Sequence, residues 1–296
     1  MRLLAFLAMA TVWGFTWVAA RWATEAAPPV LVAGMRFVVA SACFGILCLA
    51  ARIPPRIGQV RRLVAASLLV NTGCYSLLFW GVARAPTGLS AVVNMGLIPV
   101  FSMLLGAAYG QERITVRRLL SVALGAVGLA ILFASRGSSG PADGGTVALG
   151  LAAIVAATFS YAWGAVISKP LVAAYPPLSV AFWETLIGGA ALVLVSLVVE
   201  RPTLADLAAL GQGRALAGLA FLIGGGSLVG FLVYLWLLRE WGAFRAGLYA
   251  FVSPAVAVAL GVALQGEEFG VTEALGMLVM FAATALVVRP EKARAA

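Results

Sequence analysis

The chain is a succession of apolar segments, each about 20 residues long, which is the length at which an α-helix crosses the hydrocarbon core of a membrane. A chain in lipid must satisfy its backbone hydrogen bonds internally, so only helices and closed barrels span a membrane. Barrel strands alternate apolar and polar residues, whereas these segments are apolar throughout. The sequence therefore predicts an all-α polytopic membrane protein.

Composition agrees with this fold class. Of the 296 residues, 63% are hydrophobic and only 10% are charged, whereas a soluble domain carries about 25% charged residues. The connections between the apolar segments are short and rich in Pro, Gly and charge. We expect ten transmembrane helices, at residues 3–23, 30–51, 62–83, 87–109, 115–135, 147–168, 178–199, 215–238, 243–265 and 270–289.

The distribution of basic residues predicts how these helices are oriented. The net charge is +9, a balance that can indicate a nucleic-acid partner. Here the basic residues fall mainly in short connections, where they keep loops on the cytoplasmic side. With a cytoplasmic N-terminus, fourteen of the 20 Lys and Arg residues lie in cytoplasmic segments. We therefore expect both termini in the cytoplasm and the lipid bilayer, not nucleic acid, as the large partner.

Residues typical of catalytic and metal sites are scarce. Cys43, Cys48 and Cys74 lie inside apolar segments, where cysteine behaves as a small hydrophobe. The chain has no histidine, the commonest metal ligand and proton relay. It also lacks the metalloprotease, hydrolase, P-loop and dinucleotide-binding motifs. We expect no catalytic residue, no metal and no cofactor, and we interpret the protein as not an enzyme.

The two halves of the chain repeat one pattern. Pro28-Pro29 after the first span corresponds to Pro176-Pro177 after the sixth, and Arg36 corresponds to Glu184. Further on, a collinear series within and beside the fourth and ninth spans matches as follows: Arg84, Ala91, Pro99, Gly106 and Glu112 with Arg239, Ala246, Pro254, Gly261 and Glu267. Five spans is an odd number, so the second copy inserts upside down, as in inverted-repeat transporters. We expect a first repeat over 1–136, an extracytoplasmic linker over 137–146, a second repeat over 147–290 and a cytoplasmic tail over 291–296.

Matching irregularities interrupt corresponding spans of the two halves. Pro99 and Pro254 lie mid-span, where each removes a backbone hydrogen bond. Gly73 lies in the third span, and Gly226 and Gly230 lie in the eighth; Gly weakens a helix by about 1 kcal/mol relative to Ala. Matching interruptions point to hinges around a binding site. Structural kinks and close helix packing through small residues are the alternatives.

Two ionisable residues, Arg36 and Glu184, lie inside spans. Charge in lipid is costly and marks a functional site by default. We expect both to line a cavity, as partners of a substrate carboxylate and amine respectively. Anchoring near the membrane surface is the alternative for each. Glu184 is also the one candidate for an intramembrane proton carrier.

Aromatic and polar side chains in the middle of spans form the rest of the candidate site. Trp and Tyr ordinarily favour membrane interfaces, so mid-span positions indicate a cavity that stacks on and hydrogen-bonds a flat amphipathic solute. Ordinary packing is the alternative for each residue taken singly. The candidates for substrate contact are Trp17, Tyr75, Trp80, Asn94, Tyr161, Trp163 and Tyr249.

Four stretches carry a resemblance to a known family: the opening Trp13-Gly14-Phe15-Thr16-Trp17, the connection Ala27-Pro28-Pro29, and the repeated segments Ala91 to Glu112 and Ala246 to Glu267. They resemble the EamA family of the drug/metabolite transporter superfamily over nearly the whole chain. Within it the chain looks most like the YddG-type exporters of aromatic amino acids. The second half departs from the opening motif, with Tyr161 and Ala165 in place of the two Trp residues.

The resemblance implies a ten-helix fold around a central cavity, with the fifth and tenth spans peripheral, in a bacterial inner membrane. Its motif positions Pro99, Glu112, Pro254 and Glu267 are implied to be structural. We predict an alternating-access exporter of small amphipathic metabolites, most specifically aromatic or neutral amino acids, acting as a monomer. A broad exporter of drugs or other metabolites is the alternative; an intramembrane enzyme or non-transporting scaffold is a remote one. Proton antiport and facilitated diffusion both stay open.

Overall fold

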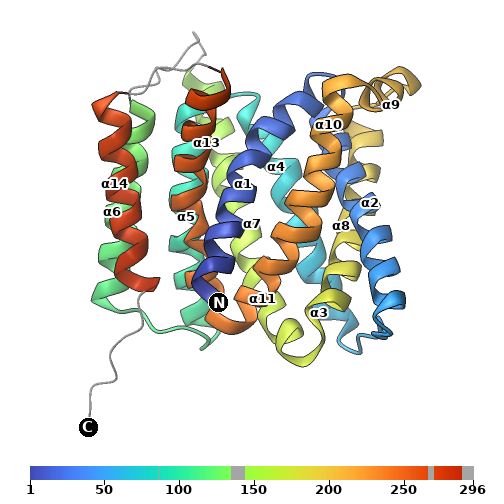
Figure 1. The fold of residues 1–296 in the computed structure, drawn as a ribbon, viewed down its shortest axis with the longest axis horizontal. Helices are drawn as coiled ribbons and strands as arrows, with labels where there is room; N and C mark the ends of the chain where they lie inside the picture. The colour runs from blue at the N-terminus through green and yellow to red at the C-terminus, as the bar shows by residue number, and fades with distance from the viewer. Residues whose placement is uncertain (86, 135–143, 266–269, 289–296) are drawn as a thin grey trace.

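The computed structural model describes residues 1–85, 87–134, 144–265 and 270–288 (Figure 1). The regular secondary structure of this part of the chain is all helix, without strands. Its long helices run roughly parallel to one another as a bundle. Nine helical stretches within it are long and apolar enough to cross a membrane. The predicted fold class, an all-α polytopic membrane protein, is confirmed.

Seven helices are single elements: α1 (Arg2–Thr24), α2 (Pro29–Ala50), α5 (Thr87–Ala108), α6 (Val116–Ala134), α7 (Gly144–Ala174), α8 (Pro177–Val199) and α14 (Val271–Val288). Three predicted spans consist of more than one element. The third is α3 (Val60–Ser67), the π-helix η1 (Leu68–Gly73) and α4 (Cys74–Val82); the eighth is α10 (Gly213–Phe221), the π-helix η2 (Leu222–Phe231) and α11 (Leu232–Trp241); the ninth is α12 (Ala243–Gly247) and α13 (Tyr249–Gln265). A short helix, α9 (Leu204–Leu210), precedes α10.

Nine of the ten predicted spans coincide with the membrane-length helices. The predicted span 115–135 coincides with α6, which is not among those nine, so the count of ten stays a prediction. Helix α7 is longer than the predicted span 147–168 and includes the last three residues of the predicted linker. Residues 137–143 of that linker, Glu267 and the predicted tail 291–296 lie outside the described residues.

Proline starts two long helices where it costs no hydrogen bond. Pro29 and Pro177 occupy the first positions of α2 and α8, where the backbone N–H has no partner within the helix anyway. Glu200, just after α8, accepts hydrogen bonds from Val30 N and Leu31 N, both at 2.9 Å. A carboxylate at a helix N-terminus also interacts favourably with the positive end of the helix dipole. This contact joins the start of α2 to the end of α8.

The helix contacts pair the two halves in a regular way. Helix α1 packs on α13, and its counterpart α7 packs on α5. Helix α1 also packs on α10 and η2, whereas α7 packs on α4 and η1. Helix α2 packs on α8, and α6 on α14; Figure 1 shows the second pair at one edge of the bundle. This exchange of partners is what two copies related by a two-fold axis give.

The two π-helices occupy corresponding places in the two halves, and each receives a side chain from the other half. Trp13 Nε1 on α1 donates to Gly226 O in η2 at 2.9 Å, and Ser160 Oγ on α7 donates to Leu69 O in η1 at 2.8 Å. π-Helical turns inside α-helices are frequent at functional sites.

The candidate hinge glycines lie at these contacts. A Cβ at Gly230 would lie 2.3 Å from Trp13 Nε1, and one at Gly73 would lie 2.6 Å from Ser160 Oγ. Gly226 likewise faces Arg36, whose Nη2 would be 3.0 Å from its Cβ. All three therefore permit close packing in this conformation, and their role as hinges stays a prediction.

The candidate kink prolines lie inside helices, Pro99 in α5 and Pro254 in α13. The predicted span 243–265 is interrupted at Leu248, between α12 and α13. There the backbone bonds tighten to the i−3 pattern, from Leu248 N to Arg245 O at 3.3 Å and from Phe251 N to Leu248 O at 3.0 Å. The break lies before Pro254, and Tyr249 is the first residue of the helix that follows it.

Candidate binding cavity

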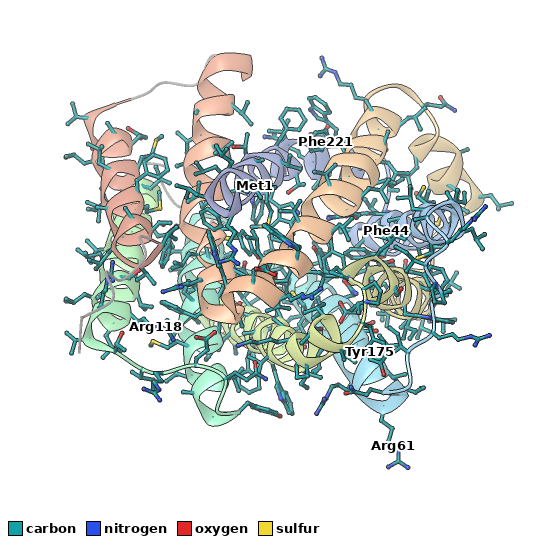
Figure 2. The ribbon with its side chains drawn as sticks, turned by 60° about the horizontal axis from the view of Figure 1, so that its bottom comes forward. Met1, Phe44, Arg61, Arg118, Tyr175 and Phe221 are labelled. Atoms are coloured by element: carbon teal, nitrogen blue, oxygen red, sulfur yellow. The ribbon has the colours of Figure 1, made fainter. Side chains whose placement is uncertain are left out.

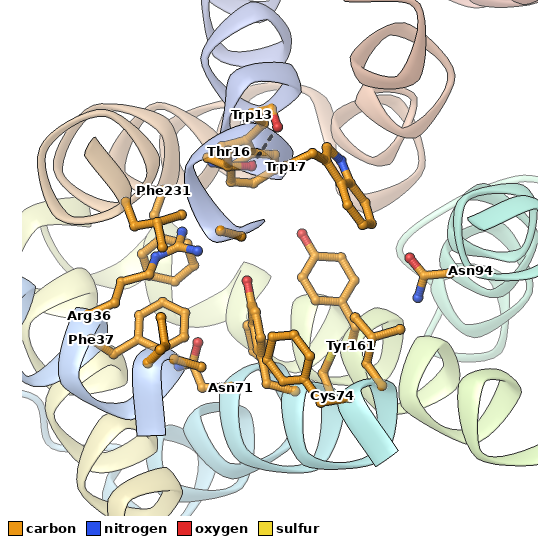
Figure 3. A pocket seen from close by; sticks show the side chains of 18 of the residues that line it. Trp13, Thr16, Trp17, Arg36, Phe37, Asn71, Cys74, Asn94, Tyr161 and Phe231 are labelled. Atoms are coloured by element: carbon orange, nitrogen blue, oxygen red, sulfur yellow. Dashed lines mark hydrogen bonds between the residues drawn. The ribbon is translucent and has the colours of Figure 1, made fainter. Parts of the chain in front are cut away.

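A cavity lies between the two halves of the bundle (Figure 3). It holds about 1180 Å³ of space between atoms, its open mouth included. The first half contributes α1, α2, η1, α4 and α5, and the second contributes α7, η2 and α13. Its polar and aromatic lining residues are Trp13, Thr16, Trp17, Thr24, Arg36, Phe37, Asn71, Tyr75, Phe79, Asn94, Tyr161, Phe231, Tyr249 and Ser253.

The cavity runs from the middle of the bundle to one end only. On α1 it is lined from Trp13 to Thr24, and on α2 from Val32 to Phe37. These are the parts of both helices nearest the α1–α2 connection. Trp17, 44% exposed, stands in the open part of α1. With the predicted topology, this end faces the outside of the cell.

The opposite end of the bundle is closed by packed side chains. Phe6 and Met9 near the start of α1 are fully buried, and the Phe6 ring lies 5.7 Å from that of Trp241. Figure 2 turns this end toward the viewer, with Arg61, Arg118 and Tyr175 on it. These residues belong to the segments predicted to face the cytoplasm.

A polar cluster at the closed end joins the α5–α6 connection to α6 and α7. The Glu112 carboxylate lies 2.9 Å from Arg118 Nη1 and 3.8 Å from Lys169 Nζ. Lys169 also donates to Gln111 O at 3.2 Å, and Gln111 Nε2 donates to Val166 O at 2.9 Å. Glu112 therefore has the structural role implied by its motif position, and it links the two halves below the cavity.

Tyrosines from the second half and Trp13 from the first form the floor of the cavity. The hydroxyls of Tyr161 and Tyr249 are 3.2 Å apart. The Trp13 ring lies edge-on to Tyr249 at 4.4 Å and 5.4 Å from Tyr234. The floor thus offers flat apolar faces together with hydroxyl groups, which suits an aromatic solute with polar substituents.

Two asparagines are held in the wall by hydrogen bonds to neighbouring helices. Asn71 Nδ2 donates to the backbone oxygen of Glu184 at 2.9 Å, and Asn94 Nδ2 donates to Thr158 Oγ1 at 3.0 Å. Both side chains are buried. Figure 3 shows Asn94 across the cavity from Arg36. These bonds fix both amide groups at the cavity wall.

Arg36 brings a charge into the cavity. Its side chain is 8% exposed, and Nε donates to Ser227 Oγ at 2.9 Å. The guanidinium carbon lies 4.9 Å from the centre of the Phe37 ring. No carboxylate among the described residues forms an ion pair with it.

Six of the nine predicted contact residues line the cavity, and three lie outside it. Those in the lining are Trp17, Arg36, Tyr75, Asn94, Tyr161 and Tyr249. Trp80 is 40% exposed and stacks with Arg84, whose guanidinium carbon is 3.8 Å from the ring centre. Trp163 donates to the Tyr109 hydroxyl at 2.8 Å. Successive helical residues point about 100° apart, so Trp163 faces away from the side that Tyr161 presents to the cavity.

Glu184 also lies outside the cavity, contrary to the expectation that it lines it. Its side chain is fully buried in α8, and Oε1 accepts a 2.5 Å hydrogen bond from Ser168 Oγ on α7. Its Oε2 has no hydrogen-bond partner. It sits behind Asn71, because this face of α8 packs against α7 and η1 and not against the open space.

Several lining residues were not among the predicted contacts. Trp13 shares a helix face with Trp17, four residues away, and this spacing could have found it. Asn71 lies in the segment noted for its neighbouring glycine. Thr16, Phe37, Phe231 and Ser253 carry no signal of their own, because each is one of many similar residues in an apolar helix.

Comparison with known proteins identifies the family. The model of the EamA-like transporter family matches residues 1–134 and 148–289. The chain belongs to the EamA-like transporter family. It is therefore a transporter, and the expectation that it is not an enzyme is confirmed. The predicted resemblance to this family is confirmed as well.

Individual relatives cover almost the whole chain. The uncharacterized inner membrane transporter YedA of Escherichia coli (strain K12) is 28% identical over 96% of this chain and 89% of its own length. A probable amino-acid metabolite efflux pump of Salmonella typhimurium is 25% identical over 93% of this chain and 91% of its own length. A solved crystal structure matches with a TM-score of 0.81 at 18% identity, covering 97% of this chain and 96% of its own. At that identity the likeness shows the fold alone.

Proposed function

We propose that this EamA-like transporter exports small amphipathic metabolites across the inner membrane, most specifically aromatic or neutral amino acids, as YddG-type exporters do. The observation that carries the proposal is the cavity between the halves, with aromatic rings, hydroxyls and amides around one arginine. Such a lining suits a flat apolar solute that bears a polar or charged head. A relative named as a probable amino-acid metabolite efflux pump supports this solute class, and one named as an inner membrane transporter supports the location.

Alternating access is the proposed mechanism. The cavity is open at one end and closed at the other by Phe6, Trp241 and the Glu112 cluster. If the termini are cytoplasmic, this is an outward-facing conformation, the state in which an exporter releases cargo. The exchanged helix contacts of the two halves support a second state in which the closed and open ends are reversed.

In this mechanism the π-helices and the interior prolines are the proposed hinges. Gly73 in η1 and Gly226 and Gly230 in η2 lie where one half contacts the other. Pro99 and Pro254 lie in the two helices that carry Asn94 and Tyr249. Bending at these positions would change the cavity wall directly. The protein is proposed to work as a monomer, because the cavity lies within one chain.

Export of hydrophobic drugs or other metabolites is the second candidate function. The apolar majority of the lining favours it. Many such drugs are bulky cations, however, and the charge of Arg36 would repel them at close range. Inhibition of transport by bulky cations but not by amino acids would favour this function.

Uptake into proteoliposomes tests the proposal. Purified protein is reconstituted, the vesicles are preloaded with unlabelled phenylalanine, tryptophan or threonine, and exchange of the labelled amino acid is followed. We expect exchange of phenylalanine and tryptophan well above that in protein-free vesicles. Equal rates with and without protein, for all three amino acids, would remove the amino-acid version of the function.

A further inference from the structure

The cavity contains a positive charge without a counter-charge. Arg36 is the one charged side chain among the described residues that line it. Its hydrogen-bond partner, Ser227 Oγ at 2.9 Å, is a neutral hydroxyl. A guanidinium stays charged at any physiological pH and carries five N–H donors and no acceptor. In a buried site such a group calls for an anion.

A partner for a positively charged ligand group is missing from the same lining. Glu184, which corresponds to Arg36 in the second half, is fully buried outside the cavity with Ser168 as its hydrogen-bond partner. An ammonium group would find only ring faces, hydroxyls and amides. Aromatic rings do attract cations, but here Arg36 repels them from within the same low-dielectric space. The cavity therefore offers a charged partner to the carboxylate of an amino acid but none to its ammonium group.

We infer that the cavity recognises its cargo by a carboxylate on an aromatic or apolar body, and that the α-ammonium group is dispensable. Aromatic organic acids without an amine are then substrates of the same site. This inference rests on the proposed export function and names its substrate class. A carboxylate can accept two parallel hydrogen bonds from one guanidinium. Phe37 lies under the guanidinium carbon at 4.9 Å and holds its orientation, while Trp17, Tyr75 and Tyr161 are placed to cover the aromatic body.

Binding of three matched probes to the purified protein in detergent tests this inference. L-Phenylalanine, 3-phenylpropanoate and 2-phenylethylamine share a phenyl ring and a short chain, and they differ in their charged groups. Calorimetric titration avoids the passive leakage of the neutral acid and amine through a bilayer. We expect phenylpropanoate to bind at least as tightly as phenylalanine, and phenylethylamine to bind at least about tenfold more weakly because it lacks the charge-assisted hydrogen bonds.

Substitutions of Arg36 connect this selectivity to the guanidinium. Arg36→Gln should weaken binding of both carboxylates at least about tenfold without weakening that of the amine, and Arg36→Lys should retain part of the affinity. Arg84→Gln is the matched control: it removes one positive charge from a residue that does not line the cavity, and it should leave all three affinities unchanged.

Each outcome bears on a different statement. Equal or tighter binding of phenylethylamine, or binding of phenylalanine but not of phenylpropanoate, overturns the inference and leaves the export function standing. Unchanged carboxylate affinity in folded Arg36→Gln protein overturns it as well. Failure of the wild-type protein to bind any probe removes the proposed aromatic substrates, and the inference with them. If Arg36→Gln does not fold, the comparison of probes on the wild-type protein decides alone.

Discussion

The indole N–H of Trp13 donates a 2.9 Å hydrogen bond to the carbonyl oxygen of Gly226. This bond crosses from the first half of the chain to the second, and it reaches a carbonyl in the π-helix η2. The bond from Ser160 Oγ to Leu69 O makes the same crossing in the opposite sense. The two halves are therefore joined by reciprocal contacts. In each contact, a side chain on the first helix of one half donates a hydrogen bond to a backbone carbonyl in the π-helix of the other half.

Replacing Gly230 by Ala tests the first of these contacts. The added Cβ would lie 2.3 Å from Trp13 Nε1, and overpacking of this kind costs about 1–3 kcal/mol. We expect Gly230→Ala to lower the thermal unfolding midpoint in detergent. Gly224→Ala is the control in the same π-helix, because its Cβ would meet nothing within 4 Å. Equal midpoints for the two variants would contradict the packing described here.

Trp17 and Trp80 form a matched pair for substrate contact. Trp17 lines the cavity, whereas Trp80 stacks on Arg84 outside it. An aromatic pair contributes about 0.5–1.5 kcal/mol beyond area burial, which is roughly a two- to tenfold change in affinity. We expect Trp17→Ala to weaken phenylalanine binding by more than about twofold, and Trp80→Ala to leave the affinity within about twofold of the wild-type value. The reverse order, measured by calorimetry, would place the ligand elsewhere.

Glu112 should keep the cytoplasmic end closed. Its carboxylate pairs with Arg118 at 2.9 Å and lies 3.8 Å from Lys169, and it is nearly buried. Removing one member of a buried ion pair is strongly destabilising for the arrangement that contains it. We therefore expect Glu112→Gln to shift the protein away from the closed-end state.

Labelling of a single cysteine measures that shift. In a background without the three native cysteines, Ala10→Cys places a thiol in a fully buried position at the closed end. A membrane-impermeant maleimide should modify it faster in Glu112→Gln than in the parent. Glu25→Gln, which disrupts an exposed pair with Arg21, is the control and should not change the rate. Identical labelling rates in the parent, Glu112→Gln and Glu25→Gln proteins would show that the Glu112 cluster does not keep the cytoplasmic end closed.

Glu184→Gln should leave substrate affinity within about twofold, because its side chain lies outside the cavity and binding energy resides in groups that touch the ligand. Glu184→Ala should lower the unfolding midpoint, since the buried Ser168 hydroxyl loses its acceptor.

Transport across an imposed pH gradient tests the hypothesis that Glu184 is a proton carrier. The same response to the gradient in Glu184→Gln and wild-type protein would exclude this carboxylate from coupling.

The sequence predicted the position of residues along their helices better than the direction in which they point. Trp17, Tyr75 and Tyr161 are predicted contacts at mid-span positions and do line the cavity, but Trp163, only two residues from Tyr161, lies outside it and donates to Tyr109. In a soluble helix, polar residues mark the exposed face. Here lipid and protein interior are both apolar, so neither face of α7 is marked. The direction of Glu184 could not be predicted for the same reason. A carboxylate that is buried between helices and accepts a hydrogen bond from Ser168 has the same sequence pattern as a carboxylate in a cavity.

The repeat was the most informative part of the sequence. Matched positions such as Pro99 and Pro254 predicted corresponding helices, and the structure places these helices in exchanged contacts with α7 and α1. Glycines marked these segments as irregular in the sequence, yet the residues that their π-helices contact, Ser160 and Trp13, lie far away along the chain. Local propensity contains no information about such partners, so these contacts are visible only in the tertiary structure.

The lone charge of Arg36 has an electrical consequence. A carboxylate without an ammonium group carries one negative charge, and moving it out of a cell whose interior is negative releases about 2.3 kcal/mol per 100 mV of membrane potential. A carrier whose empty cavity is positive, and whose loaded cavity is neutral, can use this potential without a proton or sodium partner. Anionic cargo would then drive its own exit, while a zwitterion carried by the same protein would move only down its concentration gradient.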